Sequence, residues 1–150
     1  MTLYEVLLYF HILAVAMWVG GSVMTFISAR VEGRGEAALR ARFGKRSGVI
    51  GAVIGVSAVI VLGTGIGMVL ESDAVELSQT WVWLGLSLFG LSAIIAVVYY
   101  APQSTKIAAA LEAGQVEEAA RRVKQWDLVV WLDSLLLLVI VGVMVFKPGA

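Results

Sequence analysis

The stretch VIGAVIGVSAVIVLGTGIGMVL, residues 49–70, carries no charged side chain, and its only hydroxyl side chains are those of Ser57 and Thr64. A transmembrane helix needs about 20 predominantly apolar residues to cross the ~30 Å hydrocarbon core of a bilayer. A helix of a soluble protein would instead show a polar stripe along one side, and this stretch shows none. It therefore predicts a helix that spans a membrane.

Three further runs, uncharged or nearly so, cover residues 3–29, 81–101 and 128–146. Together the four runs predict an all-α polytopic membrane protein, with four transmembrane helices in an antiparallel bundle that forms one domain over residues 1–150. The composition agrees, because 60% of the 150 residues are apolar, whereas soluble domains average roughly 45–50%. The first run lacks the basic start and the cleavage site of a signal peptide, so we expect it to remain as the first span.

The charged residues between the runs predict the orientation of the chain. The connection between the second and third spans has only the acidic residues Glu71, Asp73 and Glu76. The first and third connections are basic and contain Arg30, Arg34, Arg40, Arg42, Lys45, Arg46, Lys106, Arg121, Arg122 and Lys124. Because cytoplasmic loops are enriched in Lys and Arg, we predict cytoplasmic basic loops, both termini outside, and a location in an inner (plasma) membrane of the bacterial type.

Both cytoplasmic connections are expected to be partly helical. Residues 36–43 predict a short interfacial helix that ends at Gly44. Pro102 is well placed to open a helical turn, which Gly114 can end. The basic side chains are expected to attract anionic membrane lipids, and no nucleic-acid partner is expected, because the interleaved aromatic residues of such a surface are missing.

The second span has two pairs of glycines four residues apart, Gly51–Gly55 and Gly63–Gly67. This spacing allows the backbones of two helices to approach closely. It predicts tight packing, either inside the bundle or across a homodimer, or else room for a flat cofactor. The spacing alone does not separate these alternatives.

His11 is the only histidine of the chain and lies inside the first span. An ionisable residue in the membrane interior is costly and therefore a candidate for function. Equal depth in antiparallel spans predicts that His11, Thr64 and Ser87 meet in the outer leaflet, beside Gly65. Trp18 lies seven residues after His11, on the same helix face.

Three chemistries are open for this group. His11 can be an axial ligand of haem b, a copper ligand together with Met68 or Met144, or a packing residue that only hydrogen-bonds its neighbours. Because one chain has a single histidine, a haem with two histidine ligands would require a homodimer, and a mixed ligand set is the alternative.

Asp133 is the other unusual residue, because it lies inside the fourth span. Its depth places it ~10 Å from His11 along the membrane normal, at 1.5 Å per helical residue. That distance excludes direct pairing. Asp133 can therefore belong to a water-filled proton path, or it can hydrogen-bond a neighbouring helix.

Short motifs spread over most of the chain resemble a known family. They are His11 with Trp18-Val19-Gly20-Gly21, Thr64-Gly65, Pro102-Gln103 and Met144-Val145-Phe146-Lys147-Pro148. The chain resembles an uncharacterised family of four-span bacterial membrane proteins and its relatives, the copper-resistance D-like proteins and the HemJ-type protoporphyrinogen oxidase. The HemJ resemblance implies haem b at His11, although that type also uses an intramembrane lysine, which no span has here. The copper-resistance resemblance implies copper import.

Several function classes find no support in the sequence. It has no cysteine, which excludes disulfides and thiolate-bound clusters, and no motif of a hydrolase or of a phosphate-binding enzyme. The sequence predicts a membrane protein that binds haem b, transfers electrons and meets a redox partner in the membrane. A non-catalytic accessory subunit and a copper-handling protein are the alternatives, and enzymatic activity stays open.

Overall fold

The structure, a computed structural model, describes residues 1–32, 37–72 and 75–149, without the side chains of residues 28–47. It contains six helical elements in chain order: α1 (Leu3–Glu32), α2 (Ala37–Leu70), α3 (Thr80–Ile95), the π-helix η1 (Ala96–Tyr100), α4 (Ala101–Glu112) and α5 (Val116–Phe146). No strand occurs in the described ranges.

Four helical stretches are long and apolar enough to cross a membrane: Leu3–Ile27, Gly48–Leu70, Thr80–Glu112 and Val116–Phe146. Their outward side chains are large and apolar, as with Val59 and Val97, each 72% exposed. Such side chains gain nothing from water, and hydrocarbon is the solvent that suits them. The chain is therefore an all-α polytopic membrane protein whose spans contact lipid, as the four apolar runs predict.

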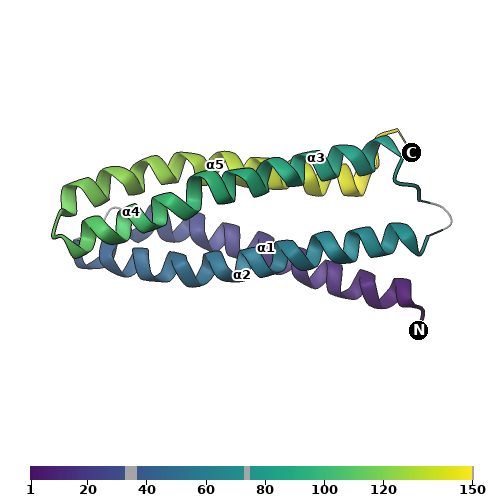
Figure 1. Cartoon of the computed structure of the whole chain (residues 1–150), viewed down its shortest axis with the longest axis horizontal. Helices are drawn as coiled ribbons and strands as arrows, with labels where there is room; N and C mark the ends of the chain where they lie inside the picture. The colour runs from purple at the N-terminus through teal and green to yellow at the C-terminus, as the bar shows by residue number, and fades with distance from the viewer. Residues whose placement is uncertain (33–36, 73–74, 150) are drawn as a thin grey trace.

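The helices form two antiparallel hairpins that lie side by side (Figure 1). One hairpin is α1 with α2, and the other pairs the continuous rod α3–η1–α4 with α5. The second hairpin has two apolar clusters, one around Trp126 and Ile107 and the other around Trp81 and Val143. Contacts between the hairpins are fewer than those between α1 and α2, and this arrangement leaves room between them.

Glycines serve two different purposes in the α1–α2 hairpin. A Cβ atom at Gly67 would lie 3.1 Å from Leu7 Cδ1, and one at Gly21 would lie 2.8 Å from Ile54 Cγ1. These two positions need glycine for close helix contact. A Cβ atom at Gly51 or Gly55, in contrast, would meet nothing within 4 Å, so this pair does not serve close packing within the chain.

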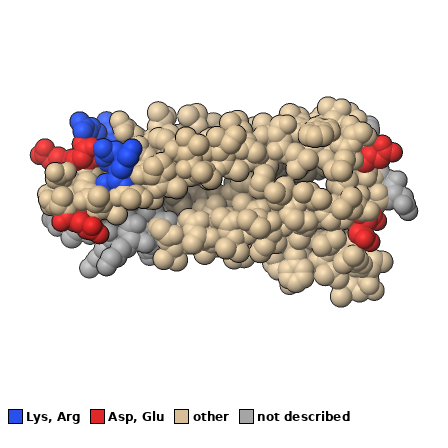
Figure 2. Space-filling model, in the orientation of Figure 1, with Lys and Arg blue, Asp and Glu red and all other residues tan. Residues whose placement is uncertain are grey.

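The two ends of the molecule differ in charge (Figure 2). Both termini and the connection from α2 to α3 lie at one end, and the turn from α4 to α5 lies at the other (Figure 1). On the face shown, Lys and Arg gather only at the α4–α5 end. There Arg121 and Arg122 form ion pairs with Glu118, the latter at 2.8 Å. The basic side chains predicted for the first connection lie outside the described side chains.

One prediction about the connections is corrected by the helix bounds. α2 begins at Ala37 and runs through Gly44 without a break, so residues 36–43 do not form a separate interfacial helix. α5 begins at Val116, well before residue 128, because acidic residues in its first turn and the ion pairs to Glu118 stabilise a solvated helix. Gly114 ends the preceding helix in the left-handed region, with φ of 70°, as predicted.

Candidate functional site

The structure joins His11 of α1 to Thr64 of α2. His11 Nδ1 lies 2.9 Å from Thr64 Oγ1, and the imidazole is half-buried. The depth of the two residues in antiparallel spans predicts this contact, and their orientation follows from the tight packing of α1 on α2. His11 lies near the start of α1 and Thr64 near the end of α2, and these helix ends are at the end of the molecule that carries both termini (Figure 1).

The hydrogen bonds around Thr64 determine where the imidazole carries its proton. Thr64 Oγ1 donates to the backbone carbonyl of Ile60 at 2.6 Å. A hydroxyl has only one hydrogen to donate, so toward His11 this oxygen accepts, and Nδ1 carries the hydrogen. The carbonyl of Val61, which lies 3.3 Å from the same hydroxyl oxygen, is likewise an acceptor. The neutral imidazole therefore has its free lone pair on Nε2.

Of the other residues predicted to lie near His11, the structure brings Gly65 to the ring but not Ser87. Gly65 lies beside the ring, since a Cβ atom there would be 3.4 Å from His11 Cε1. Ser87 is exposed on α3 and forms no hydrogen bond with His11 in the described part of the chain. The buried face of α3 includes Gly85. Ser87 comes two residues later, which is a rotation of about 200° around the helix axis, so its side chain points away from that face. The structure therefore does not bring Ser87 to His11.

The two methionines predicted as copper ligands lie in different hairpins. Met144 packs against the Trp81 cluster of the second hairpin, with its methyl group toward Gly85. Met68 is half-buried on α2, and the described residues contain no group of three or more His, Cys, Asp and Glu side chains that can hold a metal ion. Of the copper ligands predicted from sequence, His11 and Met68 therefore belong to the first hairpin and Met144 to the second.

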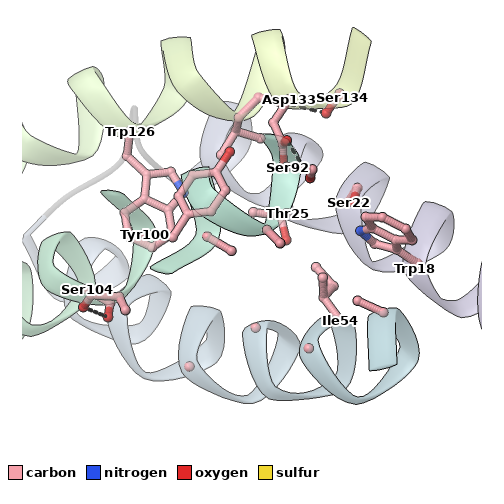
Figure 3. Close-up of a pocket in the computed structure, with 18 of the residues that line it drawn as sticks. Trp18, Ser22, Thr25, Ile54, Ser92, Tyr100, Ser104, Trp126, Asp133 and Ser134 are labelled. Atoms are coloured by element: carbon pink, nitrogen blue, oxygen red, sulfur yellow. Dashed lines mark hydrogen bonds between the residues drawn. The ribbon is translucent and has the colours of Figure 1, made fainter. Parts of the chain in front are cut away.

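A second polar group surrounds a cavity of about 330 Å³ between the two hairpins (Figure 3). Small residues of α2, including Gly51 and Gly55, form one wall. Trp18 and Phe89 stand edge to face, with ring centroids 5.4 Å apart, at the end toward His11. Tyr100 of η1 and Trp126 of α5 line the opposite end. His11 does not line this cavity.

Asp133 points into the cavity from α5 (Figure 3). Ser92 of α3 donates a hydrogen bond to its Oδ1 at 2.8 Å, and the Tyr100 hydroxyl points toward the same carboxyl. No Lys or Arg whose side chain is described forms an ion pair with Asp133. The hydrogen bond to a neighbouring helix is the second of the two roles predicted for this residue, and the proton path to His11 stays a prediction.

Trp126 lies seven residues before Asp133 on α5, and therefore on the same face. The residue is only 6% exposed, and its indole Nε1 has no hydrogen-bond partner in the structure as described. The ring of Tyr100 lies beside this indole, with ring centroids 5.1 Å apart (Figure 3). An indole N–H is a donor only, so a donor without an acceptor is enclosed among the side chains at this end of the cavity.

The π-helix η1 positions Tyr100 at this cavity. Pro102 lacks the backbone N–H that would continue the α-helical hydrogen bonding of α3. Here the N–H of Ala101 bonds instead to the carbonyl of Ala96, five residues earlier. Such a π turn rotates the following residues around the axis and is frequent at functional sites. The sequence analysis missed Tyr100, Ser92 and Trp126; the seven-residue spacing of Trp126 and Asp133 is the signal that could have found the last.

Residues 5–148 match the family described as "Predicted integral membrane protein (DUF2269)". No curated protein and no solved structure matches the chain. The family description includes no cofactor or activity, and the relationship to copper-resistance D-like and HemJ-type proteins stays a prediction. The chain belongs to this family of integral membrane proteins, with which it shares nearly its full length.

Proposed function

We propose that this protein binds haem b through His11 and serves electron transfer or a related redox task in the membrane. The observation that carries the proposal is the hydrogen bond to Thr64, which leaves the lone pair on Nε2. Metal-bound histidines usually have their other ring nitrogen held in this way, which fixes the ring orientation. Histidine is also a common axial ligand of haem iron, and the iron would supply reversible one-electron chemistry.

The proposed site is completed by a second copy of the chain. One chain supplies a single imidazole, and a homodimer supplies two. Phe10 and Ile12, the neighbours of His11 in α1, are 50% and 58% exposed, so this stretch is accessible to a flat macrocycle and to a second chain. Gly65 supports the same site, because a side chain there would press on the ring edge.

The proposed orientation places this haem in the outer leaflet. Lys106, Arg121, Arg122 and Lys124 lie on α4 and α5, at the end opposite the termini, and the positive-inside rule assigns that end to the cytoplasm of an inner-membrane protein. His11 then lies roughly 12 Å from the outer end of α1, at 1.5 Å per residue. A membrane redox partner would therefore meet the protein on its outer half.

The test is a dithionite-reduced minus oxidised absorption spectrum of the purified protein, compared with His11→Ala. We expect a sharp b-type α-band that is lost in His11→Ala and kept in Ser57→Ala, a control whose hydroxyl bonds only to the Val53 carbonyl of its own helix. A colourless protein after expression with added haem precursor would overturn the proposal and favour an accessory subunit. Copper that co-purifies and depends on His11 would instead favour copper handling.

A further inference from the structure

The cavity between the hairpins has the size of a ligand site and a position that membrane solutes can reach. Its volume of about 330 Å³ lies in the range of small-molecule pockets, roughly 300–1,000 Å³. The space-filling view shows the molecule hollowed along its middle, between the two hairpins (Figure 2). In a bilayer this side of the molecule faces hydrocarbon, so a ligand dissolved in the membrane can enter between the hairpins.

One carboxyl group is the only ionisable acid or base, apart from the weakly acidic phenol of Tyr100, among the described residues that line the cavity. Asp133 points into the cavity from α5 and is half-buried (Figure 3). No described Lys, Arg or His lines the cavity with it. Ionisable residues inside a membrane are rare, usually face a cavity or an opposite charge, and mark the paths of ligands and ions. The charge of Asp133 therefore has no counter-ion within the described lining.

The neighbours of Asp133 hold its carboxyl group without neutralising it. Ser92 donates a hydrogen bond to Oδ1 at 2.8 Å, and the hydroxyl of Tyr100 points toward the same carboxyl group (Figure 3). Both neighbours are neutral hydroxyl groups, whereas an ionised carboxylate can accept about four hydrogen bonds. The carboxylate is thus fixed in place and keeps its attraction for a positive charge in the cavity.

The rest of the cavity wall suits the apolar part of a cation. Trp18 and Phe89 line one end and Tyr100 lines the other, so aromatic rings lie on both sides of the carboxyl group. The faces of aromatic rings attract organic cations, and quaternary ammonium groups are recognised in this way. The wall that α2 forms includes Gly51 and Gly55, where a Cβ atom would meet nothing within 4 Å. These glycines leave room for bulky apolar substituents.

We propose that this cavity binds a lipophilic organic ammonium ion. The positively charged nitrogen faces the carboxylate of Asp133, and the apolar substituents contact the aromatic rings and fill the space beside the glycines of α2. The site is separate from the proposed haem site, because His11 does not line the cavity. Binding of the ammonium ion therefore does not depend on haem.

Other occupants fit the cavity less well. An acyl chain or another neutral molecule would fill the space but leave the carboxylate without a counter-charge, and an unpaired charge inside a protein is strongly unfavourable. Ca²⁺ and Mg²⁺ take at least six oxygen ligands, whereas this space is much larger than one ion and its walls are mainly apolar. The combination of one negative charge with a large apolar volume selects an organic cation.

The first experiment titrates the full-length protein in lipid nanodiscs with benzyltrimethylammonium, by calorimetry against empty nanodiscs. Asp133→Asn keeps the size of the side chain and an oxygen that accepts from Ser92, and it removes the charge. We expect binding to weaken more than tenfold, because opposite charges about 4 Å apart attract strongly in a partly buried site. Glu117→Gln is the matched control, because it removes one carboxylate from an exposed position of the same helix, and its affinity should be unchanged.

A neutral ligand of the same shape tests the role of the charge from the side of the ligand. Neopentylbenzene has a carbon atom where benzyltrimethylammonium has its nitrogen, so the two molecules differ in charge and hardly in size. We expect neopentylbenzene at equal concentration to leave the binding of the cation to the wild type unchanged.

A second pair of variants tests the location without touching a polar group. Gly55→Leu adds a side chain at a cavity-lining position where a Cβ atom meets nothing within 4 Å, and we expect binding of the cation to fall more than tenfold. Gly63→Leu is the control on the same helix, because Gly63 has equally open surroundings and does not line the cavity. Leucine is a better helix former than glycine, so both variants should fold, as far-ultraviolet circular dichroism can verify.

The outcomes separate the proposal from its rivals. Weaker binding in Asp133→Asn and Gly55→Leu, with both controls unchanged, supports an ammonium ion in the cavity. Binding in either test variant that equals that of the wild type overturns the proposal, as does the absence of benzyltrimethylammonium binding above empty nanodiscs. Displacement of the cation by neopentylbenzene would identify a purely apolar pocket, such as lipid fills, and would also overturn it. None of these results depends on the haem spectrum.

Discussion

Thr64→Val tests the role of the hydrogen bond that orients His11. Valine has nearly the shape of threonine but lacks the oxygen that accepts from Nδ1 at 2.9 Å. The change removes the hydrogen-bond partner of Nδ1 and frees the imidazole to rotate. The substitution therefore acts on ring orientation and on the location of the proton, while His11 itself is kept.

The size of the effect follows from two kinds of contribution. Hydrogen bonds between transmembrane helices contribute on average about 0.6 kcal/mol and at most about 1.7 kcal/mol, so the fold should lose only that much stability. Loss of the group that orients a metal-bound histidine typically lowers metal affinity about 10- to 100-fold. The protein with Thr64→Val should therefore remain folded while its haem affinity falls by one to two orders of magnitude.

The assay is a haem titration of the apo-protein in detergent, followed by the change in the Soret absorbance, with thermal unfolding of the same samples. Ser57→Ala is the control, because Ser57 lies seven residues earlier on α2 and bonds only within its own helix at 2.8 Å. Equal haem affinity in the wild type, Thr64→Val and Ser57→Ala would refute the reasoning that the Nδ1 hydrogen bond prepares His11 for iron.

Three further expectations concern packing and orientation. Gly21→Ala should destabilise the fold by about 1–2 kcal/mol in unfolding with sodium dodecyl sulfate, because the added Cβ atom would overpack against a side chain of α2. Gly20→Ala is the control and should be neutral or stabilising, because a Cβ atom there meets nothing within 4 Å. Equal stability of the two variants would contradict this expectation. Ser92→Ala should cost about 1 kcal/mol in the same assay, since it removes the 2.8 Å hydrogen bond to the intramembrane carboxyl group of α5, and an unchanged unfolding midpoint would argue against that bond. Because the chain has no cysteine, a membrane-impermeant maleimide should label Ser78→Cys in intact cells and Gln115→Cys only after lysis, and the reverse pattern would invert the proposed topology.

The sequence predicted the spans and the depth of residues within them, because both follow from the length of apolar runs and the fixed rise of a helix. That reasoning brought His11 and Thr64 together. It did not bring Ser87 to them, since the rotation of α3 about its axis depends on which side packs against α5. Depth is fixed by local geometry, whereas rotation is fixed by tertiary contacts.

The cavity was beyond the reach of sequence patterns for a related reason. The spacing of Gly51 and Gly55 left close helix packing and room for a flat group open as alternatives, and in the structure both glycines line the cavity and face open space. Tyr100 reaches the cavity only because η1 inserts a π turn before Pro102, and a regular α-helical period would place it elsewhere. The separation of the hairpins and the irregular turn are properties of the packed molecule.

Electron paramagnetic resonance of the oxidised protein, with haem and protein quantified in the same sample, tests the role of His11 most directly. The account predicts a low-spin ferric signal from two imidazole ligands, one haem for two chains, and loss of both in His11→Ala. A low-spin signal that persists in His11→Ala would contradict the assignment of His11 as the iron ligand, and the absence of any haem signal in the wild type would contradict haem binding altogether.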